Sequence, residues 1–166
     1  KNKDKDTNKD ATKSKKKKKK TDKSKVIESI PCTVDGVGTV DPPRSATNVE
    51  QVVLAALKKD PSGRTLVVYF TQTLPPSKYR KILKENINEN ILLGMIQVAT
   101  YLSTQPDHEP LAKHLKGLSR VRRLESTIMM LDDKPKLMLQ TSIEDLVTEE
   151  TIAEQIRKGF SSSFNF

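Results

Sequence analysis

The sequence has very few of the residues on which catalytic centres, metal sites and disulfide-linked domains depend. It contains no tryptophan, one cysteine and two histidines among 166 residues. The lone Cys32 excludes an internal disulfide, and it lacks the spaced Cys or His partners of a zinc site. Such cysteine usage fits a reducing compartment, so we expect a cytoplasmic protein that can also be nuclear.

The two histidines are not spaced to hold a metal ion. His108 and His114 are six residues apart, which places them on different faces of one helix, and no third ligand is near them in the sequence. No nucleophile motif surrounds Cys32 or the serines, and no phosphate-binding glycine loop is present. We therefore predict no enzymatic activity, no catalytic residue, no metal and no cofactor, and we expect both histidines to lie at the surface.

Long apolar runs are also missing. No stretch approaches the eighteen or so apolar residues of a membrane span, so we predict no membrane segment. The chain begins without Met, and it has no charged start followed by an apolar run and a small-residue cleavage site. We therefore expect a fragment of a longer protein without a secretory signal.

Charge is concentrated at one end of the chain. The net charge is +9, and residues 1–25 hold thirteen of the 30 basic residues and four of the 21 acidic ones, which leaves 17 of each sign elsewhere. This Lys-rich segment has almost no apolar residue, so we predict that it is disordered. It has no aromatic residue to stack on bases and no arginine, so any contact with nucleic acid would be nonspecific. The six consecutive lysines at 15–20 are interpreted as a solvated spacer, with a nuclear-import signal or a contact with an anionic surface as the alternatives.

Residues 26–41 turn to Val, Ile, Thr and Gly, a composition that allows a weak hairpin around Asp35 and Gly36. Because an isolated two-stranded hairpin is marginal in water, we interpret this stretch as linker. The prolines at positions 42 and 43 exclude regular structure directly after it.

From Thr47 onward, apolar residues recur at helical spacing. Thr47 and Glu50 form a possible capping box for the first helix, and the run 66–74 is also interpreted as helix. Asn88 is placed to cap a long apolar helix that we expect at the centre, and Ser119 is placed to cap a later one. The sequence thus predicts an all-α protein, a compact bundle of about seven or eight short helices. Its three parts are a disordered Lys-rich tail and linker (1–41), the helical bundle domain (42–147), and a short C-terminal helix and tail (148–166).

The stretch from residue 42 to about 146 resembles the C-terminal domain shared by RNA polymerase II-associated protein 3 and sperm-associated antigen 1. The order and spacing of several short motifs carry this resemblance, although none is diagnostic alone. The motifs are PPRS at 42–45, LKKDP at 57–61, PPSKYRKIL at 75–83 and LSRVRRLESTIMML at 118–131.

The resemblance implies a non-enzymatic adaptor of the co-chaperone type. In that family the helical bundle docks onto RuvB-like AAA+ ATPases, while upstream tetratricopeptide repeats, absent from this sequence, hold heat-shock protein 90. The function implied is assembly of RNA polymerase, ribonucleoprotein particles or axonemal dynein arms.

The resemblance also implies which helix meets the partner. The residues matching the family's docking helix are Arg120, Arg123, Ser126, Met129 and Met130. Arg123 matches the family directly, whereas Ser126 stands where the family has Met, which removes a large apolar contact from the implied interface. An alternative from another class is a nucleic-acid-associated nuclear protein that acts through its Lys-rich tail, and steep salt dependence of binding would favour it.

Overall fold

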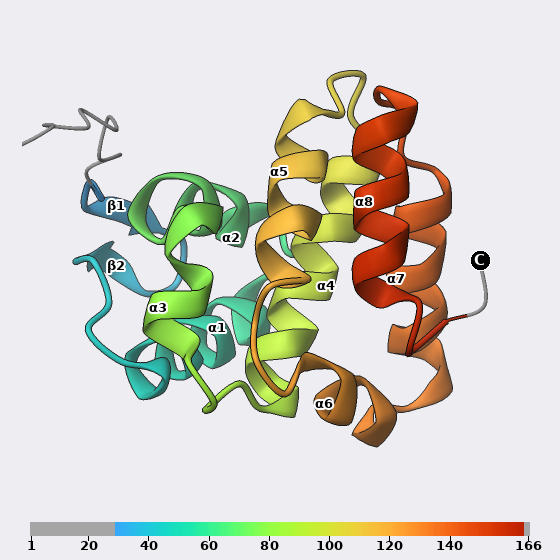
Figure 1. Cartoon of the computed structure of the whole chain (residues 1–166). Helices are drawn as coiled ribbons and strands as arrows, with labels where there is room; N and C mark the ends of the chain where they lie inside the picture. The colour runs from blue at the N-terminus through green and yellow to red at the C-terminus, as the bar shows by residue number, and fades with distance from the viewer. Residues whose placement is uncertain (1–28, 165–166) are drawn as a thin grey trace, which may run out of the picture.

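The computed structural model describes residues 29–164, and it confirms the predicted all-α class (Figure 1). A small hairpin is followed by eight α-helices and two short turns of other helical types. The predicted Lys-rich tail lies outside the described residues. Within them, no helix is both long enough and apolar enough to cross a membrane. The elements are β1 (Cys32–Val34), β2 (Gly38–Val40), α1 (Ala46–Lys59), α2 (Arg64–Val68), the π-helical η1 (Tyr69–Thr73), the 3-10 turn η2 (Pro76–Lys78), α3 (Tyr79–Leu83), α4 (Glu89–Ser103), α5 (Glu109–Leu118), α6 (Leu124–Met130), α7 (Asp133–Glu144) and α8 (Glu150–Phe160).

The hairpin is part of the core, so the interpretation of this stretch as linker is wrong. β1 and β2 pair antiparallel, with Cys32 opposite Val40. Both residues and Val34 are buried. β1 packs against α2 and η1, and it is this tertiary support that an isolated hairpin lacks. The chain just before β1 is also fixed, because the Thr73 hydroxyl donates to the Ile30 carbonyl at 2.7 Å.

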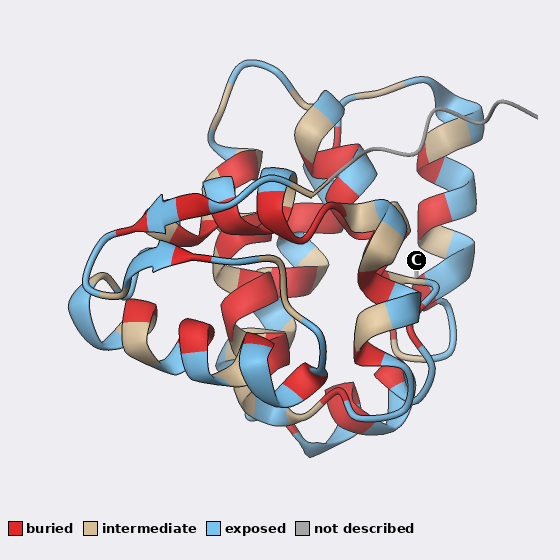
Figure 2. Cartoon of the chain, turned by 90° about the vertical axis from the view of Figure 1, so that its left-hand side faces the viewer, coloured by how far each residue is buried: buried red, intermediate tan, exposed pale blue. Residues whose placement is uncertain are grey.

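Helix α4 is the central element, as predicted. Its N-cap is Asn88, whose side-chain oxygen accepts a hydrogen bond from the Ile91 amide at 3.0 Å. α1, α2, α5, α6 and α7 all contact α4, and Figure 2 shows buried positions on the inward faces of the helices. α1 crosses α4 at Gly94, where a Cβ atom would overlap the Val53 side chain. The missing side chain therefore sets how closely these two helices approach.

The first helix begins differently from the prediction. Ser45, and not Thr47, caps α1, because its hydroxyl oxygen accepts from the Asn48 amide at 3.4 Å. The helix starts at Ala46, which is buried and so fixes the first turn against the core. The helix predicted over 66–74 is confirmed, with α2 passing directly into η1.

The C-terminal helix completes the bundle against α5 and α7. Ile156 and Phe160 of α8 are fully buried, and Ile152 packs partly buried against the same core. At Gly159 a Cβ would lie 2.7 Å from the Ser119 Cβ, so α8 also lies close to the end of α5. Figure 1 shows α8 alongside α5 and α7.

Candidate protein-docking site

A tight turn between α5 and α6 positions the residues that the resemblance singled out. The prediction that Ser119 caps the second of these helices is wrong, because Ser119 ends α5. Its amide donates to the Leu115 carbonyl at 2.9 Å, and its hydroxyl donates to the Lys116 carbonyl at 3.1 Å. The chain turns again at the next residues, where the Val121 amide donates a hydrogen bond to the Leu118 carbonyl at 2.9 Å. α6 therefore starts five residues later than Ser119.

Arg123 begins α6 with an unusual backbone. Its φ of 62° lies in the left-handed region, which costs an ordinary L-residue about 1–2 kcal/mol. Its carbonyl accepts three hydrogen bonds: from the Thr127 amide at 3.0 Å, the Thr127 hydroxyl at 2.9 Å and the Ser126 hydroxyl at 2.9 Å. These bonds hold the first turn, which has no side-chain N-cap. The backbone at Arg123 is thus held in place by a well-bonded turn.

The five predicted docking residues all lie on the outer side of this segment. Leu124, Thr127 and Ile128 are buried and anchor α6 to the core. Arg122 and Glu125 of this segment are also exposed, and we call the five predicted docking residues the α6 patch: Arg120, Arg123, Ser126, Met129 and Met130.

Two of the patch residues are large apolar side chains in contact with solvent. Met129 is 63% exposed and Met130 is 78% exposed. Leu137 of α7, seven positions beyond Met130, is also 63% exposed. Single exposed apolar residues are ordinary, but three within nine residues of chain suggest a binding surface.

Leu137 is the residue that sequence reasoning missed. Its apolar neighbours in the sequence, Leu139, Ile143 and Leu146, are all buried. Positions 137 and 139 are two residues apart and cannot share one helical face, so one of them had to point outward. That spacing was the available signal.

The expectation of two surface histidines is wrong for His114. This residue is fully buried, with Nδ1 2.7 Å from the Tyr79 hydroxyl and Nε2 2.9 Å from the Met95 carbonyl. Its position on α5 shares a face with Leu111, Leu115 and Leu118, which carries it into the core. Burial lowers the pKa of His114 to about 4, so the ring is neutral at pH 7. His108 is half-buried, and its Nδ1 accepts from the Val147 amide at 3.0 Å.

The remaining candidate chemistry does not assemble into a site. Over residues 29–164, no group of three His, Cys, Asp or Glu side chains comes together to hold a metal ion. Cys32 is buried in the hairpin. The α6 patch, with its exposed Met side chains, is the candidate site for contact with another macromolecule.

Comparison with known proteins gives two matches. The model of a family described as the potential Monad-binding region of RPAP3 matches residues 42–136, which include the whole α6 patch. The NMR structure of the C-terminal domain of the human RPAP3 protein has the same fold, with a TM-score of 0.58 and 17% sequence identity over 71% of this chain and 87% of that one. No curated protein matches the chain.

Proposed function

Because the chain belongs to the family of the potential Monad-binding region of RPAP3, we propose that it is a non-enzymatic adaptor domain that docks onto a protein partner through the α6 patch. One observation carries this proposal: Arg123, Met129 and Met130 are all exposed on a short helix whose other face is buried.

The composition of the patch suits the centre of a protein interface. Arg and Met are enriched in interfaces, and the unbranched Met side chain adapts to the shape of a partner. The patch is also held rigidly, since Leu124 and Ile128 pack into the core and the Arg123 carbonyl binds three donors. A rigid patch loses little conformational entropy when a partner binds.

We propose a RuvB-like AAA+ ATPase as the partner, with this chain linking it to heat-shock protein 90 through repeats elsewhere in the full protein. The client complex would be RNA polymerase, a ribonucleoprotein particle or an axonemal dynein arm. Ser126 changes the interface that the resemblance implies, because its hydroxyl is bound to the Arg123 carbonyl and offers no apolar area. The apolar contact then depends on Met129, Met130 and Leu137.

The direct test is capture of purified RuvB-like ATPases by the full chain, at moderate and at high salt. Met129→Ser/Met130→Ser removes the apolar contact and should weaken binding by about tenfold or more. Arg123→Glu reverses the charge at this position and should weaken binding by a similar factor. Glu154→Ser/Gln155→Ser makes a matched double change at exposed positions of α8 and should leave binding intact.

The salt dependence of binding distinguishes the adaptor function from the alternative, nucleic-acid-associated function. Binding through the α6 patch should persist at high salt, because apolar contacts are not screened. Binding through the Lys-rich tail would fall steeply with salt and would ignore the α6 variants. Monad, named in the family description, serves as a second bait. If neither bait is retained by the wild-type chain at moderate salt, the adaptor proposal fails.

A further inference from the structure

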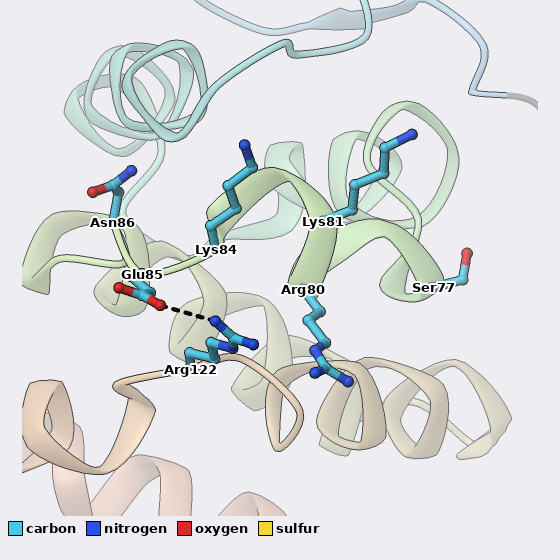
Figure 3. A pocket seen from close by; sticks show the side chains of 7 residues that line it. All are labelled: Ser77, Arg80, Lys81, Lys84, Glu85, Asn86 and Arg122. Atoms are coloured by element: carbon cyan, nitrogen blue, oxygen red, sulfur yellow. Dashed lines mark hydrogen bonds and ion pairs between the residues drawn. The ribbon is translucent and has the colours of Figure 1, made fainter.

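A basic pocket lies between α3 and Arg122, which precedes the first residue of α6 by two positions. Its volume is about 630 Å³. Figure 3 shows the seven side chains that line it. They are Ser77, Arg80, Lys81, Lys84, Glu85, Asn86 and Arg122.

Basic side chains outnumber acidic ones in the lining of the pocket. Glu85 is the single carboxylate among the seven, and its Oε1 is 2.9 Å from Nη1 of Arg122. Within residues 29–164, no ion pair involves Arg80, Lys81 or Lys84. Three lining cations therefore face solvent without an anionic partner in this part of the chain.

The backbone of α3 sets where these three cations lie. α3 has five residues and ends at Leu83, and the next residue, Lys84, has a positive φ of 49° although it is not glycine. The turn is closed by the Lys84 amide on the Arg80 carbonyl at 3.2 Å and by the Asn86 amide on the Leu83 carbonyl at 2.8 Å. A lysine in this conformation is strained, and strain of this kind concentrates at functional sites.

We propose that the basic pocket binds an acidic peptide segment of a protein partner, through carboxylates spaced along an extended chain. Figure 3 shows Arg80 and Arg122 on the side of α3 that faces α5, whereas Lys81 and Lys84 extend to its other side. Cations distributed around a helix suit several carboxylates better than one compact anion. Arg80 can bind a carboxylate in a bidentate manner, and Ser77 and Asn86 add neutral donors.

The lining also argues against nucleic acid. None of the seven residues is aromatic, and the ring of the adjacent Tyr79 is fully buried, so bases would find nothing to stack on. The pocket is a second docking site that goes beyond the adaptor function proposed above. It uses none of the residues of the α6 patch.

The test is an NMR titration of the ¹⁵N-labelled full chain with a synthetic Asp/Glu-rich dodecapeptide. Amide shifts identify the site residue by residue, which separates binding at the pocket from attraction to the Lys-rich tail. We expect shifts at residues 77–86 and at Arg122 that saturate. Arg80→Gln/Lys84→Gln should weaken the affinity read from these amides by about fivefold or more.

Two controls make the result specific. Lys58→Gln/Lys134→Gln removes the same amount of charge from exposed positions of α1 and α7 and should change the affinity by less than about twofold. Met129→Ser/Met130→Ser should leave it unchanged, so that failure here and failure of the α6 proposal are distinguishable. Shifts confined to residues 1–25, equal loss in both Gln variants, or tighter binding of a single-stranded oligonucleotide at the same amides would overturn the proposal.

Discussion

The Tyr79 hydroxyl lies 2.7 Å from Nδ1 of His114, a buried hydrogen bond that joins α3 to α5. The neutral His114 ring donates from Nε2 to the Met95 carbonyl on α4 at 2.9 Å, so Nδ1 accepts the single proton of the Tyr79 hydroxyl. The Phe70 carbonyl lies 3.0 Å from the same hydroxyl. The rings of Phe70, Tyr79 and His114 also pack edge to face. One polar pair therefore connects η1, α3, α4 and α5 inside the core.

Burial of His114 makes the fold sensitive to acid. Its pKa is about 4 in the folded chain against 6.5 for the free group, because burial disfavours the charged ring. Above pH 7 both states are neutral, so His114 adds no pH dependence. As the pH falls below 6.5 the unfolded chain binds a proton that the folded one does not, and the free energy of unfolding should fall by about 1.4 kcal/mol per pH unit until about pH 4.

Urea unfolding of the wild type and of His114→Gln at several pH values measures this effect. Carboxylates titrate in both proteins, so the informative quantity is the difference between the two curves. That difference should be constant above pH 7 and should change by up to about 3 kcal/mol between pH 6.5 and 4. Parallel curves throughout would show that folding does not lower the pKa of His114.

Two buried tyrosines should respond oppositely to loss of their hydroxyl. Tyr79→Phe leaves His114 Nδ1 and the Phe70 carbonyl without this partner, so it should lower the free energy of unfolding by about 1–3 kcal/mol. The Tyr69 hydroxyl has no hydrogen-bond partner among the described residues. Tyr69→Phe should therefore be neutral or stabilising by up to about 1 kcal/mol. Equal losses in the two variants by chemical denaturation would contradict the assigned network.

The crossing of α1 and α4 should not tolerate a methyl group. Gly94→Ala would improve helix propensity by about 1 kcal/mol, but its Cβ overlaps the Val53 side chain. The steric cost should dominate, with a net loss of about 1–3 kcal/mol in thermal or urea unfolding. Val53→Ala in the same chain should recover part of this loss, as a double-mutant cycle would show. A stabilised Gly94→Ala protein would mean that the helices are farther apart.

Arg123 should be replaceable by glycine without loss of stability. Glycine adopts a positive φ freely, so Arg123→Gly relieves the strain at the start of α6 and should leave the free energy of unfolding unchanged or raise it by up to about 1 kcal/mol. Arg120→Gly, at an exposed position in the same turn with no positive φ, should be destabilising by about 0.5–1 kcal/mol. Calorimetric melting of the pair checks this, and the reverse order would contradict the left-handed turn.

Features set by local spacing were predictable from the sequence. The all-α class, the central α4 with its Asn88 cap and the helical run before Pro75 follow from apolar periodicity and capping chemistry. The exposure of Met129 and Met130 could not be obtained in this way, because Met more often fills a core than lies at the surface. The resemblance located those two residues, and the structure then placed them in solvent.

Features that depend on contacts distant in sequence were missed. The hairpin is marginal by itself and forms because η1 and α2 cover it. His114 looked like a surface residue because its buried partners, Tyr79 and the Met95 carbonyl, are 35 and 19 positions away. The basic pocket joins α3 to Arg122, across 37 positions from Glu85, and no local pattern signals it.

The anchoring of Ile30 has a mechanical consequence. The Ile30 amide donates to the Gln72 carbonyl at 3.4 Å and its carbonyl accepts from Thr73, so the segment before β1 is attached to η1. Tension applied from the N-terminal direction would load these two bonds and the short β1–β2 ladder before it reached α4. The hairpin would yield first, and the α6 patch and the basic pocket would stay assembled while the molecule was pulled.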